Sequence, residues 1–250
     1  MSTPTELAFS QVVKSYGGFT LGPIDTVFST GVTALLGANG AGKTTLIQLA
    51  VGVLAPDSGR VVTPSEQRRH RVAAEVGYLP QDFTGPKGVR VGEYLTFIAW
   101  ARSTRARRLT KEDVHHALER VQLTGKVNAK IGQLSGGMVR RLGIAQALLG
   151  QAGMLFLDEP TVGLDPVQRR DLRALLTDLG AEATVVVSTH LSEDVAAVAD
   201  TVHVLSAGRS VFDGSTAALC ALAGSDTVTG DAVEAGFMAA IAERAVDVAG

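Results

Sequence analysis

Short apolar segments rich in β-branched residues alternate along the chain with longer segments of helical periodicity. The segments typical of strands are residues 31–37, 75–80, 153–160, 183–190 and 201–208. Several of them are apolar without alternation, which is typical of parallel strands buried on both faces. Helices are predicted to begin at Thr44, at Thr110, after Ser135, after Pro166 and after Ser192. The alternation predicts an α/β fold with a mostly parallel sheet covered by helices.

Two regions depart from this alternation. Near the N-terminus, short alternating segments separated by turn signals predict antiparallel strands, and from about residue 84 to 150 the strand signal vanishes in favour of helix. We therefore expect one domain over residues 1–220. Its core comprises residues 1–83, with the antiparallel β part, and 151–220, and residues 84–150 form an inserted helical subdomain. The Ala-rich residues 221–250 are predicted to form a helical tail.

Composition narrows the class of protein. Of the 250 residues, 46% are hydrophobic and 19% are charged, which argues against a disordered chain. The formal net charge of −2 gives no basic surface for nucleic acid, so no nucleic-acid partner is expected. The single cysteine, Cys220, excludes an internal disulfide and fits a reducing compartment. Neither a signal peptide nor an apolar run of ~18 residues is visible, so we expect a protein that is soluble by itself.

A glycine-rich stretch, GANGAGKTT at residues 37–45, directly follows one predicted strand and leads into a predicted helix. This is the P-loop, or Walker A, pattern, in which glycines let successive backbone N–H groups point at phosphate oxygens. Lys43 is expected to reach the β- and γ-phosphates, and the Thr44 hydroxyl to bind Mg²⁺. The residues expected to surround the nucleotide here are Gly37, Asn39, Gly40, Ala41, Gly42, Lys43, Thr44 and Thr45.

A pair of carboxylates, Asp158 and Glu159, ends the apolar segment MLFLDEP at residues 154–160. Ligands of parallel sheets bind at the carboxyl ends of strands, so these side chains are predicted to face the P-loop. Asp158 suits the Mg²⁺ shell, and Glu159 suits orientation or deprotonation of an attacking water. Taken alone, such a pair is more typical of a helix cap or a turn; the upstream P-loop favours the catalytic interpretation.

Between these two motifs, LSGGM at residues 134–138 resembles the signature motif of ATP-binding cassette (ABC) ATPases. Further landmarks follow in the family's order. They are Tyr16, at the position of the adenine-stacking aromatic residue; Gln81, matching the Q-loop glutamine; Asp165 in GLDP, matching the D-loop; and His190 in STH, matching the switch histidine. From about residue 7 to 215 the chain resembles the nucleotide-binding subunit of an ABC transporter, a P-loop NTPase core with an antiparallel β subdomain and a helical subdomain.

The resemblance implies a role for each landmark, and each has a simpler alternative. Tyr16 would stack on adenine, or would be a packing aromatic. Gln81 would contact Mg²⁺ or water, or would be an exposed loop glutamine. His190 would donate to the γ-phosphate, or would be a capping or core histidine.

The resemblance also implies a partner subunit. Ser135, Gly136 and Gly137 precede a predicted helix and form a second anion site. By the resemblance this site reaches the ATP bound by another copy, so two chains, expected to be a homodimer, enclose two ATP molecules head to tail. Met138 stands where the family usually has glutamine.

Missing features favour a transporter over the other functions of ABC ATPases. DNA-repair and chromosome-packing members need long coiled coils or several cysteines, and translation factors carry two cassettes. The alternatives are a cassette of an importer and a non-transport ATPase in DNA repair or translation. By resemblance we expect export of a drug, antibiotic or peptide, driven from the cytoplasmic face of the membrane by a peripheral subunit bound to a separate permease.

The segment from residue 84 to 100 is the predicted docking surface for that permease. Its apolar residues, more than one helix stripe can bury, are Val91, Tyr94, Leu95, Phe97, Ile98 and Trp100. We therefore expect part of this set to be exposed as a cleft. The alternative is a helix packed wholly within the subunit.

Overall fold

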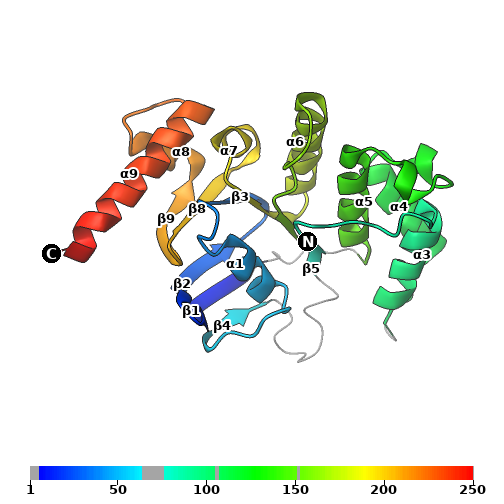
Figure 1. Ribbon diagram of the computed structural model, residues 1–250, viewed down its shortest axis with the longest axis horizontal. Helices are drawn as coiled ribbons and strands as arrows, with labels where there is room; N and C mark the ends of the chain where they lie inside the picture. The colour runs from blue at the N-terminus through cyan, green and yellow to red at the C-terminus, as the bar shows by residue number, and fades with distance from the viewer. Residues whose placement is uncertain (1–5, 64–75, 105–106, 151–152, 250) are drawn as a thin grey trace.

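The computed structural model describes residues 6–63, 76–104, 107–150 and 153–249 (Figure 1). Glu75, where one strand was predicted to begin, and residues 151–152, where the core was predicted to resume, lie outside the described residues. Within the described ranges, no helix combines the length and the apolar character needed to span a bilayer.

The larger sheet has six strands, and all but one edge strand run parallel. In spatial order they are β5 (Val76–Leu79), β6 (Met154–Asp158), β7 (Thr184–Thr189), β3 (Gly31–Leu36), β8 (Thr201–Ser206) and β9 (Arg209–Ser215). Strand β9 pairs antiparallel with β8 at one edge. The predicted mostly parallel sheet is confirmed. Strand β9 was not predicted, because its sequence, RSVFDGS, is half-exposed at the edge and lacks a continuous apolar run.

The smaller sheet is antiparallel and is formed mainly by the N-terminal residues. Its strands are β2 (Phe19–Phe28), β1 (Leu7–Tyr16) and β4 (Ser58–Val62), with β1 in the centre. The prediction of antiparallel strands at the N-terminus is therefore confirmed. Strand β4 was not predicted, because its five residues, SGRVV, are exposed or only partly buried and carry no clear alternation.

Helices connect the strands and form both ends of the molecule. They are α1 (Lys43–Ala50), α3 (Val91–Arg102), α4 (Lys111–Arg120), α5 (Gly136–Leu148), α6 (Pro166–Gly180), α7 (Ser192–Val198), α8 (Thr216–Ala221) and α9 (Gly230–Ala249), with 3-10 turns at Thr124–Lys126 and Ile131–Gln133. The predicted cap of α4 is present, since the Asp113 N–H donates to Thr110 Oγ1 and the Thr110 N–H donates to Asp113 Oδ2.

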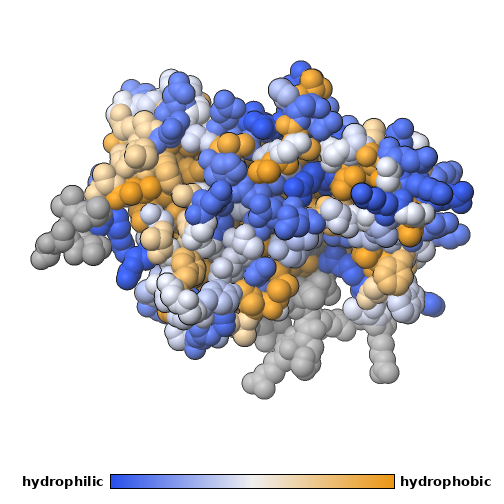
Figure 2. Space-filling view, in the orientation of Figure 1, coloured by the Kyte–Doolittle hydropathy of each residue, from blue (hydrophilic) through white to orange (hydrophobic). Residues whose placement is uncertain are grey.

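Three apolar clusters hold these elements together. Helix α1 lies between the two sheets, and Phe28 of the smaller sheet meets Phe156 of the larger one edge to face, with ring centroids 5.9 Å apart. A second cluster joins α3, α4, α5 and α6 to the larger sheet, and a third joins α7, α8 and α9 to β3 and β8. In Figure 1, α3, α4 and α5 form one end of the molecule and α8 and α9 the other. Figure 2 shows apolar side chains gathered over α8 and α9.

The order of the strands determines which loops meet. Strand β3 lies between β7 and β8, and beyond β7 the sheet continues with β6 and then β5. Because these strands are parallel, the residues after their carboxyl ends share one edge of the sheet. That edge receives the loop 37–42 after β3, Gln81 after β5, Glu159 after β6 and His190 after β7.

Candidate active site

The loop between β3 and α1 closes around the ammonium group of Lys43. Gly40 and Gly42 adopt φ angles of 81° and 110°, in the left-handed region that favours glycine. Lys43 is 6% exposed, and its Nζ donates to the carbonyl oxygens of Gly37 at 2.7 Å and Ala38 at 3.2 Å. A cation is therefore enclosed in the loop at the N-terminus of α1, where the helix dipole also favours an anion.

Glu159 lies between the two basic groups of this edge. Its Oε1 is 3.4 Å from Lys43 Nζ, and its Oε2 is 3.1 Å from His190 Nδ1. Glu159 is 4% exposed and has a φ of 47°, an uncommon conformation for a residue with a side chain. Its N–H donates to Ser188 Oγ at 2.9 Å. Such backbone strain is enriched at functional sites, where the surroundings hold it in place.

Asp158 is buried, and one of its two carboxylate oxygens has a hydrogen-bond partner. It is 1% exposed, and its Oδ1 accepts from Ser188 Oγ at 2.5 Å. Its Oδ2 is buried without a hydrogen-bond partner among the described residues. An unpartnered buried carboxylate oxygen is costly, so the position fits Mg²⁺ or a metal-bound water. Burial, together with the charge of Asp158, also raises the pKa of the nearby Tyr78 phenol.

A cavity of about 280 Å³ opens at the P-loop. Its lining residues are Phe19, Asn39, Gly40, Gly42, Lys43, Thr44, Thr45, Gln81 and Glu159. All of these except Phe19 were proposed as site residues from the sequence. The described residues contain no cluster of three His, Cys, Asp or Glu side chains suited to a metal ion. A metal at this site would therefore depend on phosphate oxygens and water for several of its ligands, as Mg²⁺ commonly does.

Two aromatic residues flank the turn of the β1–β2 hairpin. Tyr16, predicted to stack on adenine, is 43% exposed and lies outside the cavity lining, with Lys14 Nζ 5.9 Å from its ring centroid. Phe19 pairs with Tyr16 across the hairpin and lines the cavity beside Gly42. The sequence reasoning missed Phe19. Its place directly after the Gly17–Gly18 turn, three residues from the predicted base-binding Tyr16, was an available signal.

The segment LSGGM forms the start of α5, away from the P-loop cavity. Ser135 caps this helix, its Oγ accepting from the Met138 N–H at 3.3 Å. Met138 is partly buried against the apolar core. Gly136 is exposed, and a Cβ built there would have no neighbour within 4 Å. A Cβ built at Gly137 would lie 3.0 Å from the side chain of Gln168.

Asp165 caps the adjacent helix. Its Oδ1 accepts from the Gln168 N–H at 2.9 Å at the start of α6. Because Gln168 also packs on Gly137, the starts of α5 and α6 lie side by side. Neither helix start contributes a residue to the lining of the P-loop cavity.

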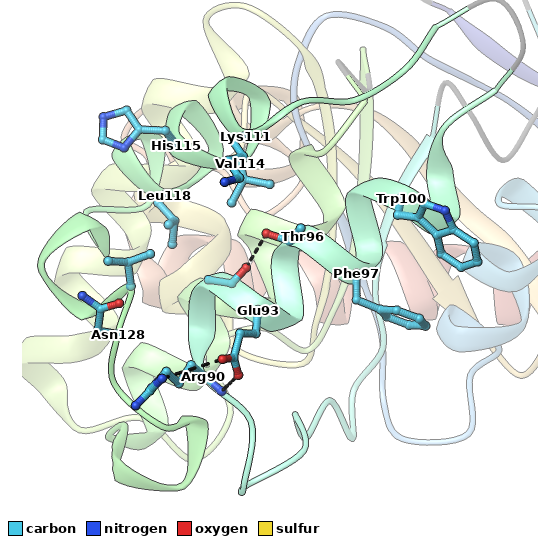
Figure 3. Close-up of a pocket in the computed structure, with 12 residues that line it drawn as sticks. Arg90, Glu93, Thr96, Phe97, Trp100, Lys111, Val114, His115, Leu118 and Asn128 are labelled. Atoms are coloured by element: carbon cyan, nitrogen blue, oxygen red, sulfur yellow. Dashed lines mark hydrogen bonds and ion pairs between the residues drawn. The ribbon is translucent and has the colours of Figure 1, made fainter.

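A second depression lies between α3 and α4, and we refer to it as the α3–α4 hollow. It has a volume of about 790 Å³, and Val114 and Leu118 of α4 lie across it from α3 (Figure 3). Phe97 and Trp100 project side by side from the end of α3, with ring centroids 5.9 Å apart and exposures of 59% and 70%. Val91 and Leu95 are buried, whereas Phe97 and Trp100 are exposed, so part of the apolar set of this segment is exposed, as expected.

The sequence that forms this site matches a known protein family. The family described as ABC transporter matches residues 26–162, which contain the P-loop, the LSGGM segment and both carboxylates. The chain belongs to the ABC transporter family. More specifically, it is an ATP-binding subunit of that family.

Individual relatives support the assignment to this ABC family. An ABC transporter ATP-binding protein of Bacillus subtilis, YxlF, is 39% identical over 72% of this chain, which spans 60% of that protein. The Nod factor export ATP-binding protein I of Paraburkholderia xenovorans is 38% identical over 86% of this chain and 72% of its own length. Among solved structures, cbiO1 of Clostridium perfringens, part of the ABC transporter complex cbiONQ, is 28% identical over 86% of this chain and 90% of its own, with a TM-score of 0.74.

Proposed function

We propose that this ABC subunit binds and hydrolyses ATP to power export through a separate membrane permease. The observation that carries the proposal is the placement of Glu159, buried between Lys43 and His190 at the wall of the P-loop cavity. That arrangement brings together, at one edge of the sheet, Lys43 to bind phosphate, Glu159 to act on water and His190 to contact the γ-phosphate.

Nucleotide binding is assigned to the P-loop and Mg²⁺ binding to its neighbours. The backbone N–H groups of the loop and the Lys43 ammonium bind the phosphates. Asp158, through its unpartnered Oδ2, would hold Mg²⁺ directly or through water, together with Thr44 and Gln81. When bound, the metal supplies charge neutralisation at the phosphate oxygens. Tyr16 and Phe19 offer two aromatic rings near the cavity mouth for the base and sugar.

Hydrolysis is assigned to Glu159 and His190. The Glu159 carboxylate is placed to accept a proton from the attacking water or to orient it, and His190 Nδ1 holds that carboxylate. With Nδ1 engaged, Nε2 is the ring atom that can contact the γ-phosphate. Once the γ-phosphate leaves, its contact with His190 and its contact with Lys43 are both lost.

A second copy of the chain is proposed to complete the second anion site. Ser135, Gly136 and Gly137 do not line the chain's own P-loop cavity, and Gly136 is open to solvent. A second copy, docked head to tail, would place its ATP on this helix start, with Asp165 beside the contact. ATP would then hold the homodimer closed, and loss of the γ-phosphate would release it.

The end of α3 is proposed as the permease docking surface. The two exposed rings of Phe97 and Trp100 border the α3–α4 hollow, whose wall is apolar at Val114 and Leu118. Charged groups at its rim, from Arg90 and Lys111, suit a short amphipathic helix presented by a permease. This arrangement would hold the subunit at the cytoplasmic face of the membrane as a peripheral protein.

Export, rather than import, is favoured by relatives whose printed names concern export, such as the Nod factor protein above. The test is to purify the affinity-tagged chain from native membranes and identify the membrane protein that accompanies it. We expect a permease without an extracytoplasmic binding protein, and phosphate release from Mg-ATP by the purified chain. A binding protein in the complex would contradict export, and failure to release phosphate would contradict the ATPase assignment.

A further inference from the structure

Arg102, the last residue of α3, joins three elements through backbone carbonyl groups. Its Nη1 donates to the carbonyl oxygens of Gln146 at 2.9 Å and Ala147 at 3.2 Å, near the end of α5. Its Nη2 donates to the carbonyl oxygen of Val76 at 2.9 Å, at the start of β5. Burial lowers the pKa of this guanidinium, as expected for a cation withdrawn from water. One side chain thus ties α3, α5 and β5 together.

Helix α5 runs along β5 in close contact at two positions. A Cβ built at Gly77 would lie 2.3 Å from the carbonyl oxygen of Ala147, so only glycine allows this approach. Farther along the strand, a Cβ built at Gly143 would lie 2.4 Å from the Leu79 side chain. There is no room between helix and strand for one to slide freely past the other.

At the other end of α5, Arg140 makes the corresponding bond. Its Nη1 donates to the carbonyl oxygen of Gln81 at 2.6 Å. Arg140, Gly143 and Ala147 are spaced three and four residues apart, so they share one face of α5 along the whole of β5. Gln81 itself lines the P-loop cavity. The contacts therefore run from the cavity, through α5, to the end of α3.

Helix α3 is also bonded to α5 about two turns before Arg102, since Tyr94 Oη donates to Gln146 Oε1. Trp100, two residues before Arg102, is 70% exposed at the proposed docking surface. A shift of Gln81 would therefore move α5 and, through Arg102, the last turn of α3.

We propose that Arg102 is a positioning residue that couples occupancy of the P-loop cavity to the exposed end of α3. The proposal rests on the proposed function in one respect, namely that the cavity binds ATP. The fork of the guanidinium is what lets one side chain bond carbonyl groups of two different elements, and a lysine ammonium on its flexible stem lacks that fixed geometry. If Arg102 only capped α5, its removal would cost stability without changing how α3 responds to nucleotide.

Trp100 is the single tryptophan of the chain, so its fluorescence reports on the end of α3 alone. We would titrate the full chain with Mg²⁺ and a non-hydrolysable ATP analogue, measuring binding by calorimetry and Trp100 emission at saturation. The wild-type emission is expected to change on binding. In Arg102→Ala the change at saturation is expected to be about fivefold smaller, because the coupling between the two sites is removed. Comparison at saturation keeps differences in affinity out of the result.

Two further variants control for loss of structure. Arg102→Lys preserves the charge and most of the packing, so it is expected to unfold near the wild-type temperature yet lose most of the emission change. Arg120→Ala removes an ion pair between the end of α4 and Glu182, which follows α6, and is expected to keep the full change.

The other outcomes distinguish failure of the coupling role of Arg102 from failure of the proposed ATP-binding function. A full emission change in both Arg102 variants would overturn the coupling role, as would a wild-type emission that stays constant while calorimetry shows binding. Loss of binding in a folded Arg102→Lys protein would assign the residue to binding instead. If the wild type binds no nucleotide, the proposed function fails and this inference fails with it.

Discussion

The starts of α1 and α5 both carry glycine-rich anion-binding patterns, but their surroundings differ. At the start of α1, Lys43 and Glu159 are 6% and 4% exposed and are held by loop carbonyls and by His190. At the start of α5, Ser135 and Gly136 are exposed, and the Ser135 hydroxyl accepts a hydrogen bond from Met138 within its own helix turn. The start of α1 therefore lies in an enclosed, hydrogen-bonded site, whereas the start of α5 lies on the solvent-exposed surface.

The difference indicates what each helix start still needs. The start of α1 has a cation, two buried carboxylates and a cavity of about 280 Å³, so it can bind a nucleotide within one chain. The start of α5 offers backbone N–H groups and a helix dipole, and its residues do not line the P-loop cavity. Our account is that the second site is completed by the nucleotide of another copy, so the two helix starts should respond differently to mutation.

The largest expected effect is at the enclosed site. Lys43→Ala should weaken ATP binding at least about 100-fold, or about 2.7 kcal/mol, because the loop loses its buried cation. Isothermal calorimetry with the purified chain would measure it. A dissociation constant within a few-fold of the wild-type value would remove the P-loop from the account.

The next effect is at the open helix start. Gly136→Asp should leave ATP affinity of the single chain unchanged, because the position has no neighbour within 4 Å and lies outside the cavity. Turnover should fall about 100-fold, because an anion now opposes the phosphate that a partner would bring. Phosphate release at high protein concentration would measure this. Unimpaired turnover would contradict a role for this surface in the reaction.

A smaller effect is expected at Ser135. Ser135→Ala removes the cap of α5 and should lower the free energy of unfolding by about 1 kcal/mol, with ATP affinity of the single chain unchanged. Urea unfolding monitored by circular dichroism would measure the first quantity, and calorimetry the second. A tenfold loss of ATP affinity would indicate that this helix start serves the chain's own nucleotide.

The same contrast shows how far sequence reasoning could go. Apart from Phe19, the lining of the P-loop cavity was predictable, because the other residues are contiguous or follow apolar strands, and parallel strands bring such residues to one edge. Ser188 was not singled out, although its hydroxyl joins Asp158 and Glu159. A buried serine within an apolar strand has no pattern that reveals its partners.

Long-range contacts were also beyond the sequence. Arg102 and Arg140 look like ordinary charged helix residues, and only the packing of α5 on β5 places their guanidinium groups on backbone carbonyls. Edge strands β4 and β9 were missed because half-exposed strands carry little apolar periodicity. The exposure of Phe97 and Trp100 was predictable from the excess of apolar residues over one helix stripe.

The smallest effect on the isolated chain is expected at α3. Phe97→Glu should change the free energy of unfolding by no more than about 0.5 kcal/mol, because the ring is 59% exposed. It should nevertheless reduce recovery of the permease with the tagged chain. Val27→Glu, at a side chain that is 57% exposed on β2, is the matched control and should leave recovery unchanged. Equal recovery with both variants would place the docking surface elsewhere.

The most direct test of a site shared between two copies is the mass of Glu159→Gln in solution with and without ATP. Replacing the carboxylate by an amide keeps the shape of the site but removes the group assigned to the attacking water, so ATP should persist. Light scattering should show the mass doubling with Mg-ATP, and adding Gly136→Asp should return it to that of one chain. A single-chain mass at saturating ATP, or a dimer that Gly136→Asp leaves intact, would contradict the account.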